Sequence, residues 1–189
     1  MSDIFFIGLE SWIIQDGNYG DFKVGQKRSF ALEFNPVGHL HPTEYINNLS
    51  TTLKTESIYS VSGQVIHKPD NWWAVDVGIK AFRESKPPIN LKTDDSFNGR
   101  IWLGIDPFFY FESLNKTDSA PALIYDWKIL EILVQTAPFV KTKDNIMVRD
   151  KTKLNWRSIS KTNAWRDDNG NAEYLLKCEQ LSKHPRHEF

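Results

Sequence analysis

Cysteine is almost absent from this chain, since Cys178 is the only one among 189 residues. A single thiol cannot form a disulfide within the chain and cannot build a cysteine-based zinc cage. Cys178 stands in an alternating apolar row, which assigns it to the core as a small apolar side chain. A chain without disulfides is typical of a reducing compartment, so the expected location is the cytoplasm.

Long apolar segments are also missing. No apolar run approaches the ~20 residues that a membrane-spanning helix needs, so no membrane association is expected. Residues 1–16 are partly apolar, but Asp3 and Glu10 interrupt them. They have no basic lead-in and no small-residue cleavage site, so no signal peptide is expected.

The sequence lacks the common catalytic and cofactor motifs. It contains no phosphate-binding G-x-x-x-x-G-K-[ST], no G-x-G-x-x-G, no G-x-S-x-G and no H-E-x-x-H. His39 and His41 supply two imidazoles, but zinc needs three or four ligands, and the prolines on both sides indicate a surface loop. We therefore expect no metal and no cofactor, and the sequence favours a protein that is not an enzyme.

Aromatic residues, by contrast, reach 13% of the chain and favour β structure. Alternation with period two dominates the chain. One apolar row consists of Trp73, Val75, Val77, Ile79 and Ala81. Successive strand side chains point to opposite faces, so Trp73 is predicted to be buried. Its neighbour Trp72 shares a face with Asp76 and Lys80 and is predicted to be exposed.

Other segments show the same alternation. The rows are Phe30, Leu32 and Phe34; Tyr59, Val61 and Val65; Ile101, Leu103 and Ile105; Tyr174, Leu176 and Cys178. Residues 122–135 fit either a helix or a strand, and their β-branched side chains favour a strand. A short helix is expected over 42–49, after Pro42. Asp167–Gly170 contains Asn-Gly, which predicts a hairpin between two strands within 156–180.

A strand with the internal glycine Gly63 is followed by a turn and a partner strand. This order resembles the early strands of small closed barrels of the OB kind, over residues 57–135 and more loosely over 4–35. The resemblance implies an all-β or β-dominated fold with an OB-like barrel or sandwich core. A C-terminal β-hairpin and at most one or two short helices complete the expected fold. The expected units are 1–56, an N-terminal β unit; 57–140, the OB-like unit; and 141–189, the basic segment and hairpin, packed as one body.

Charge is distributed unevenly although the net charge is only −1. Residues 1–140 hold 12 Lys and Arg against 17 Asp and Glu (−5), and residues 141–189 hold 11 against 7 (+4). Within the basic segment, the expected binding residues are Lys151, Lys153, Arg157, Trp156 and Trp165. Interleaved cations and indole rings are typical of a groove that binds a single-stranded nucleic acid. The other reading is a solvated edge strand guarded by lysines.

Three functions follow from these patterns. The leading one is a non-catalytic cytoplasmic protein–protein interaction module, because exposed Trp and Tyr side chains are favoured interface anchors. Chain size and composition suggest an accessory or immunity-type protein of a bacterium. The second is single-stranded nucleic-acid binding through 141–166. The third is a carbohydrate-binding or glycosidase-like site that uses Trp72, Trp102 and nearby acids; Asp106 and Glu112 flank an aromatic run but lie too far apart on a strand to act as a pair.

Overall fold

The structure is a computed structural model that describes residues 3–188, apart from the side chain of Lys151. Strands hold 46% of the chain and helices 10%, which confirms the predicted β-dominated fold. No helix in residues 3–188 is long and apolar enough to cross a membrane.

The elements follow one another with short connections. The strands are β1 (Ile4–Glu10), β2 (Lys27–Phe30), β3 (Leu32–Pro36), β4 (His41–Thr43), β5 (Ser50–Thr55), β6 (Ile58–His67), β7 (Trp73–Asp76), β8 (Lys80–Arg83), β9 (Ser96–Ile105), β10 (Tyr125–Gln135), β11 (Phe139–Lys141), β12 (Met147–Arg149), β13 (Trp156–Ile159) and β14 (Glu173–Gln180). The helices are α1 (Ser11–Gln15), α2 (Phe109–Glu112) and the 3₁₀ turns η1 (Leu114–Lys116), η2 (Lys151–Lys153) and η3 (Asp167–Gly170).

Five strands close into a barrel in the order β6-β7-β8-β3-β9, with β9 returning to β6. The β3–β8 contact is parallel and the other four are antiparallel. If β6 is counted first, this ring has the strand order of an OB barrel. β3 precedes β6 in the chain and yet takes the place of the last strand. The predicted OB-like barrel is therefore confirmed, with a changed connectivity.

The barrel strands form where side chains alternate between the two faces. β6 shows a buried side chain at every second position up to Val65, as its sequence predicts. Gly63 lies at a close approach, since a Cβ there would stand 2.5 Å from Val77 Cγ1 and 2.9 Å from the Asp76 carbonyl oxygen. Inside the barrel, Trp73 is 1% exposed and packs edge-on against Phe34, with ring centroids 4.7 Å apart. The burial of Trp73 is thus confirmed.

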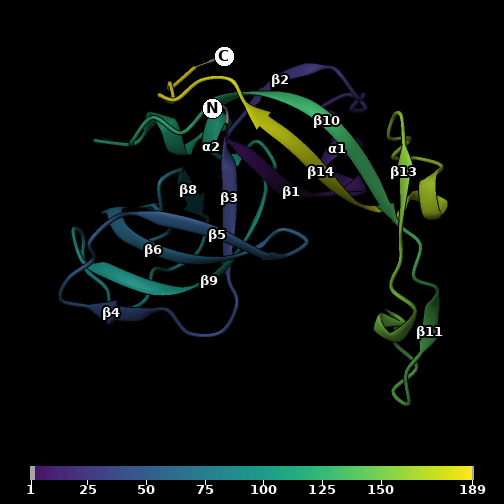
Figure 1. Cartoon of the computed structure of the whole chain (residues 1–189), viewed down its shortest axis with the longest axis horizontal. Coiled ribbons are helices and arrows are strands. Elements are labelled where there is room, and N and C mark those ends of the chain that lie inside the picture. The colour runs from purple at the N-terminus through teal and green to yellow at the C-terminus, as the bar shows by residue number, and fades with distance from the viewer. Residues whose placement is uncertain (1–2, 189) are drawn as a thin grey trace.

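Other strands of the same twelve-stranded sheet, centred on β10, form a layer above the barrel (Figure 1), and we call this layer the second sheet. β14 pairs with one edge of β10, while β2 and β13 share the other edge. β1 pairs with β14 and also meets the barrel strand β9, where Gly8 is the partner of Gly104. Residues 125–135 form a strand, which confirms the favoured interpretation of 122–135.

Trp72 is not exposed, and the prediction for it is wrong. Its side chain is 0% exposed because the outer face of β7 and β8 is also covered. The cover comes from the segment that contains α2 and η1 and from residues just before β10. On this outer face the buried apolar side chains form a second cluster, separate from the barrel core, that consists of Ala31, Trp72, Ala74, Phe82, Tyr110, Leu114, Leu123 and Ile124. The His67 ring lies 4.4 Å from the Trp72 ring, so this indole belongs to a second core.

The expected helix over 42–49 is absent from the described residues. The segment instead forms β4 against β9 and then irregular bends. The side chains that a helix would have buried are exposed: Tyr45 at 75% and Leu49 at 39%. A short helix without a buried face is only marginally stable, so pairing with β9 prevails.

The strands on either side of Asp167–Gly170 do not form the expected hairpin. They are β13 and β14, which pair with opposite edges of β10. Asn169 and Gly170 do adopt positive φ, as the Asn-Gly signal predicts. However, the connection folds back on α1, where the Gln15 amide donates to the carbonyl oxygens of Ala164 and Gly170 at 2.7 and 2.8 Å.

Candidate functional site

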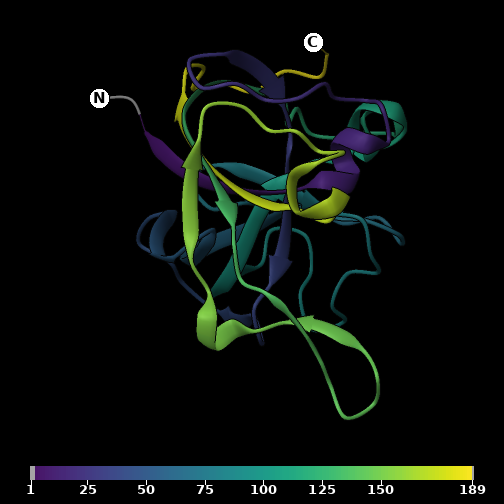
Figure 2. The same ribbon diagram turned by 90° about the vertical axis from the view of Figure 1, so that its right-hand side faces the viewer.

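A two-stranded ribbon projects from the body of the protein. It consists of β11 and β12, which pair only with each other, and we call residues 136–155 the arm (Figure 2). Its turn contains Asn145 with φ of 63°, a left-handed conformation that asparagine tolerates. The arm forms because short segments rich in β-forming apolar residues, Phe139-Val140 and Ile146–Val148, lie on the two sides of a Lys-Asp-Asn turn.

The pairing register separates the side chains of the arm onto two faces. Val140 lies opposite Val148, and the backbone bond from Thr142 N to the Ile146 carbonyl at 2.8 Å extends the ladder. Directly opposed residues share a face, so Val140, Val148 and Ile146 lie together. Their exposed fractions are 39%, 40% and 60%. These three side chains form an apolar face that remains exposed to solvent.

The base of the arm is fixed by Arg149, whose side chain is only 8% exposed. The guanidinium donates to Asp168 Oδ2 at 2.7 Å and to Glu173 Oε1 at 3.1 Å. It also donates to the carbonyl oxygens of Ala137 at 3.0 Å and Asn171 at 2.8 Å. A nearly buried arginine with this many charge-assisted and backbone bonds holds the arm in one orientation.

Two hollows lie between the base of the arm and the junction of the two sheets. Their cavity volumes are about 110 and 290 Å³, and both are lined by Glu56, Gln135 and Glu173. Trp102 and Trp156 line the smaller hollow. The structure therefore brings together two of the predicted binding residues, which lie 54 positions apart in the sequence.

The polar groups of the smaller hollow are mostly acidic. Trp156 Nε1 donates to Glu56 Oε1 at 3.2 Å, which fixes this indole at the wall. Gln135 is 9% exposed, and its Oε1 has no hydrogen-bond partner among the described protein groups. The hollow thus offers an unpaired acceptor and carboxylates, an arrangement that favours a ligand group that donates hydrogen bonds.

Trp102 lies against the backbone where the two sheets meet. A Cβ added at Gly8 or at Gly104 would collide with its indole ring. The two glycines are also cross-strand partners. Their lack of side chains therefore makes the flat surface on which Trp102 packs.

We expect Gly104→Ala to lower the free energy of unfolding by about 1–3 kcal/mol, because the new methyl group must displace the Trp102 ring. The same substitution in a Trp102→Ala background should cost much less, since the obstructing ring is gone. Urea unfolding of the four proteins of this double-mutant cycle measures the coupling. Equal costs in both backgrounds would contradict the packing described for Trp102.

The remaining predicted residues are dispersed. Lys153 is 70% exposed and its Nζ lies 3.7 Å from Asp150 Oδ2. Arg157 is exposed on β13, and Trp165, at 71% exposure, stands in the loop between β13 and β14. The side chain of Lys151 lies outside the described residues. Trp72 cannot act as a contact residue because it is buried.

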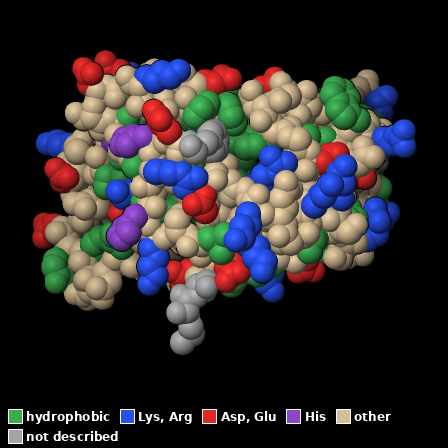
Figure 3. All heavy atoms as spheres, turned by 90° about the horizontal axis from the view of Figure 1, so that it is seen from above, with side chains coloured by type: hydrophobic (Ala, Val, Ile, Leu, Met, Phe, Trp, Pro, Cys, Tyr) green, Lys and Arg blue, Asp and Glu red, His purple; other side chains and the backbone are tan. Residues whose placement is uncertain are grey.

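Basic side chains do not form a continuous track on the face shown in Figure 3, where Lys and Arg are interspersed with acidic side chains. A groove for single-stranded nucleic acid combines a continuous positive track with stacked rings. In OB barrels such ligands bind across the second and third strands. The corresponding strands here are β7 and β8, whose outer face is covered by Tyr110 and Leu114.

The other sequence candidates also have defined places. Asp106 is 2% exposed, rather than exposed as its position beside an aromatic run suggests, and Glu112 is exposed at the end of α2. His39 and His41 are exposed. Within residues 3–188, no group of three or more His, Cys, Asp or Glu side chains is arranged to hold a metal ion.

Comparison with protein-family models, curated proteins and solved structures found no match for this chain. The function must therefore be argued from the geometry of the molecule.

Neither the apolar face of the arm nor the three side chains shared by the hollows was predicted from the sequence. A signal for the arm was present, because Asp144-Asn145 lies between two short segments rich in apolar residues. Glu56, Gln135 and Glu173 carried no such signal, since only the strand pairing brings them together.

Proposed function

We propose that this chain is a non-catalytic protein-binding module whose contact element is the arm. A cytoplasmic accessory protein of the immunity type, acting on one protein partner, is the class that we propose. The single observation that carries the proposal is the exposed apolar face of Val140, Ile146 and Val148 on a ribbon held rigidly by Arg149. The lone, fully buried Cys178 fits a reducing compartment.

The energetics of association favour such an element. Apolar side chains that are already ordered and exposed lose little conformational freedom on binding, so more of their burial contributes to affinity. The ribbon also has free backbone edges, to which a partner strand can add. The arm also carries two cationic residues: Lys141 lies on its opposite face, across from Met147, and Lys143 lies in its turn. They would favour a partner with acidic groups at the rim of the interface.

The other two hypotheses have weaker geometric support. Trp156 is surrounded by carboxylates, which would repel a phosphate backbone. The hollow between Trp102 and Trp156 has a volume of about 110 Å³, below the ~300–1,000 Å³ of most small-molecule pockets. Retention on a polyanion column tests nucleic-acid binding, and tryptophan fluorescence with a glycan panel tests carbohydrate binding.

The experiment begins with a photo-reactive side chain at position 146 of the tagged full-length protein in its native cell. A cross-linked protein is then purified and its affinity for the wild-type chain is measured. We expect the triple variant Val140→Thr, Ile146→Thr, Val148→Thr to bind at least ~10-fold more weakly, because interface cores depend on a few apolar anchors. Threonine keeps the β-branched shape and the strand preference.

A matched control is Lys141→Gln with Lys143→Gln on the same arm, for which only a small, salt-dependent loss is expected. The free energy of unfolding of the triple variant should fall by no more than about 1.5 kcal/mol, because all three side chains are already exposed and each surface substitution usually costs within about 0.5 kcal/mol. A purified partner that binds the triple variant as tightly as the wild type would exclude the arm as the contact element.

A further inference from the structure

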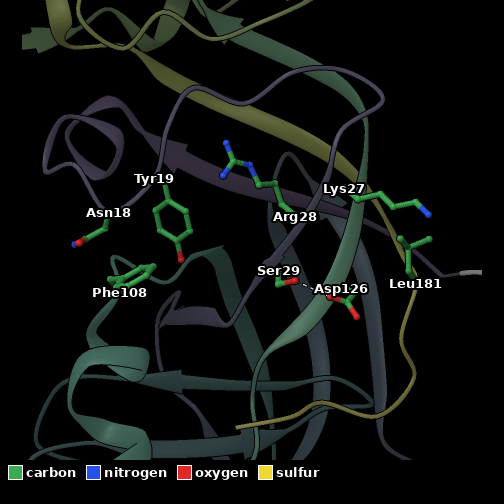
Figure 4. Close-up of a pocket in the computed structure, with 8 residues that line it drawn as sticks. All are labelled: Asn18, Tyr19, Lys27, Arg28, Ser29, Phe108, Asp126 and Leu181. Atoms are coloured by element: carbon green, nitrogen blue, oxygen red, sulfur yellow. Dashed lines mark hydrogen bonds between the residues drawn. The ribbon is translucent and has the colours of Figure 1, made fainter. Parts of the chain in front are cut away.

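A separate pocket opens along β2, near Asp126 at the opposite end of β10 from the two hollows, which Gln135 lines. Its cavity volume is about 500 Å³, within the range of small-molecule pockets. The loop after α1 and the residue before α2 form its walls (Figure 4). It contains none of the residues of the arm or of the two hollows beneath it.

Arg28 provides a positive charge that has no carboxylate partner among the described residues, and its Cζ lies 5.3 Å from the centroid of the Phe22 ring. It is half-buried on β2 and extends toward Tyr19 (Figure 4). Among the described residues it forms no ion pair, and its NH2 group reaches only the carbonyl oxygens of Gly20 and Asp21, at 3.4 and 3.3 Å. Its Nε is buried without a hydrogen-bond partner. A guanidinium taken out of water costs free energy unless an anion or several acceptors compensate for it.

Tyr19 adds a second unsatisfied donor to the same pocket. Its side chain is 5% exposed, and its hydroxyl has no partner among the described protein groups. Burial, followed by the charge of Asp106, raises the pKa of this hydroxyl well above its usual value, so it stays protonated and able to donate. Its ring meets the Phe108 ring edge-on, with centroids 5.2 Å apart. The two rings form an apolar wall beside the two donors.

The remaining charges near the pocket are largely compensated. Asp126 is bound by Arg186 through two bonds of 2.7 and 2.8 Å and accepts from Ser29 Oγ at 2.6 Å. This pair is close to neutral and uses both carboxylate oxygens. Lys27 is exposed at the rim and points away from Tyr19 (Figure 4). The uncompensated charge of the pocket is therefore positive and is provided by Arg28 and Lys27, while burial raises the pKa of the nearby Asp106 carboxyl and so disfavours its negative charge.

We infer that this pocket binds a small organic oxyanion, a carboxylate or a phosphate ester that carries a flat apolar group. The anion would accept hydrogen bonds from the Arg28 guanidinium, and the Tyr19 hydroxyl, which points toward Phe108 (Figure 4), would supply a further donor. The flat group would lie against Phe108. Arginine suits this task because its planar guanidinium matches the oxygens of carboxylates and phosphates.

The test uses phenyl phosphate, benzoate, inorganic phosphate and the neutral benzyl alcohol as probes. Each is titrated into the full-length protein while the arginine Nε–Hε resonances are followed by NMR, with Arg28→Lys used to assign the Arg28 signal. We expect saturable shifts of this signal with the anions. The stronger of phenyl phosphate and benzoate identifies the kind of oxyanion. Inorganic phosphate should bind more weakly because it lacks the ring, and benzyl alcohol should leave the Arg28 signal unchanged.

Two variants and a control separate binding from folding. Arg28→Met should weaken binding of the best anion at least ~10-fold, as expected for the loss of a hydrogen bond to a charged group. Tyr19→Phe keeps the ring and the packing and should weaken it about 3- to 10-fold, as expected for one uncharged donor. Arg157→Gln, on the exposed strand β13, should bind as the wild type does.

Either of two results would overturn the inference. One is the absence of a saturable Arg28 shift with every anion at millimolar concentration, as expected if ordered water alone satisfies the two donors. The other is equal affinity of wild type, Tyr19→Phe and a folded Arg28→Met for phenyl phosphate and benzoate. Neither result bears on the arm, which is tested with a protein partner.

Discussion

Trp72→Ala is expected to lower the free energy of unfolding by roughly 3–5 kcal/mol, about as much as Trp73→Ala. Both indoles are almost inaccessible, at 0% and 1% exposure, and each is central to a separate cluster. Removal of either ring would leave a cavity that the surrounding rings cannot fill. Urea unfolding followed by far-UV circular dichroism measures the two changes side by side.

Phenylalanine at each position supplies the matched control. Neither indole N–H has a hydrogen-bond partner within the described residues. Trp72→Phe and Trp73→Phe therefore retain most of the apolar contact while removing an unsatisfied buried donor. We expect each to cost much less than the alanine variant. A cost below about 1 kcal/mol for Trp72→Ala, beside a large cost for Trp73→Ala, would show that the outer face of β7 is open to water after all.

The contrast between Trp72 and Trp73 shows what alternation can and cannot reveal. Period two correctly separates the two faces of β7, and it correctly assigns Trp73 to the barrel interior. It carries no information on whether the other face is covered. That cover is made by Tyr110 and Leu114, more than 35 residues further along the chain. Asp76 and Lys80 made the outer face seem solvated because they lie at its edge.

Local signals were sufficient where local pairing decides the structure. The strands around Tyr59, Ile101 and Leu176 follow their sequence patterns closely. Asn169 and Gly170 also adopt the positive φ that an Asn-Gly turn favours, yet the flanking strands β13 and β14 do not pair with each other. Each of them pairs instead with the long strand β10, and a local sequence pattern contains no information on that more distant partner.

The candidate sites depend still more on the tertiary arrangement. The choice of Trp102 and Trp156 rested on their type and neighbours, and the fold places both in one hollow. The importance of Arg28 arises from its surroundings, since no carboxylate of residues 3–188 forms an ion pair with its guanidinium. The sequence shows that residue 28 is an arginine, but it does not show which acidic side chains the fold brings near its guanidinium.

The second large effect concerns pH and two buried acids. Asp106 follows β9, is 2% exposed, and accepts a hydrogen bond from the Tyr110 backbone N–H at 3.3 Å. Burial raises its pKa to about 7, with the charge of Glu33 adding to the effect and backbone N–H groups opposing it. Burial likewise raises the pKa of Glu33 to about 7, and Arg83 partly opposes the shift.

These shifts fix the sign of the pH dependence. In the unfolded chain the two carboxyls titrate near ~4, so between pH 4 and 7 the folded state binds more protons than the unfolded state. The free energy of unfolding must therefore fall as pH rises through that range. The pKa of Asp106 is about 7 in the folded state and 3.8 without the fold. This difference corresponds to a loss of stability on the order of 4 kcal/mol when the buried carboxyl ionises. Asp126 has the opposite effect on stability below pH 4. The hydrogen bond from Arg186 lowers the pKa of Asp126, so the stability that its ionised form contributes is lost when the pH falls and the carboxylate is protonated.

We therefore expect stability to be greatest near pH ~5 and clearly lower at pH ~8, because Asp106 and Glu33 must ionise while buried. Asp106→Asn should remove a large part of this fall, since the amide oxygen can still accept from Tyr110 without ionising. Glu33→Gln should remove a further part. Glu112→Gln, an exposed acid six residues after Asp106, serves as the control and should leave the profile unchanged. Urea unfolding at intervals between pH 4 and 8 measures all four proteins. Stability that rises steadily from pH 5 to 8, or an Asp106→Asn profile as steep as that of the wild type, would show that Asp106 is not held in its protonated form by burial.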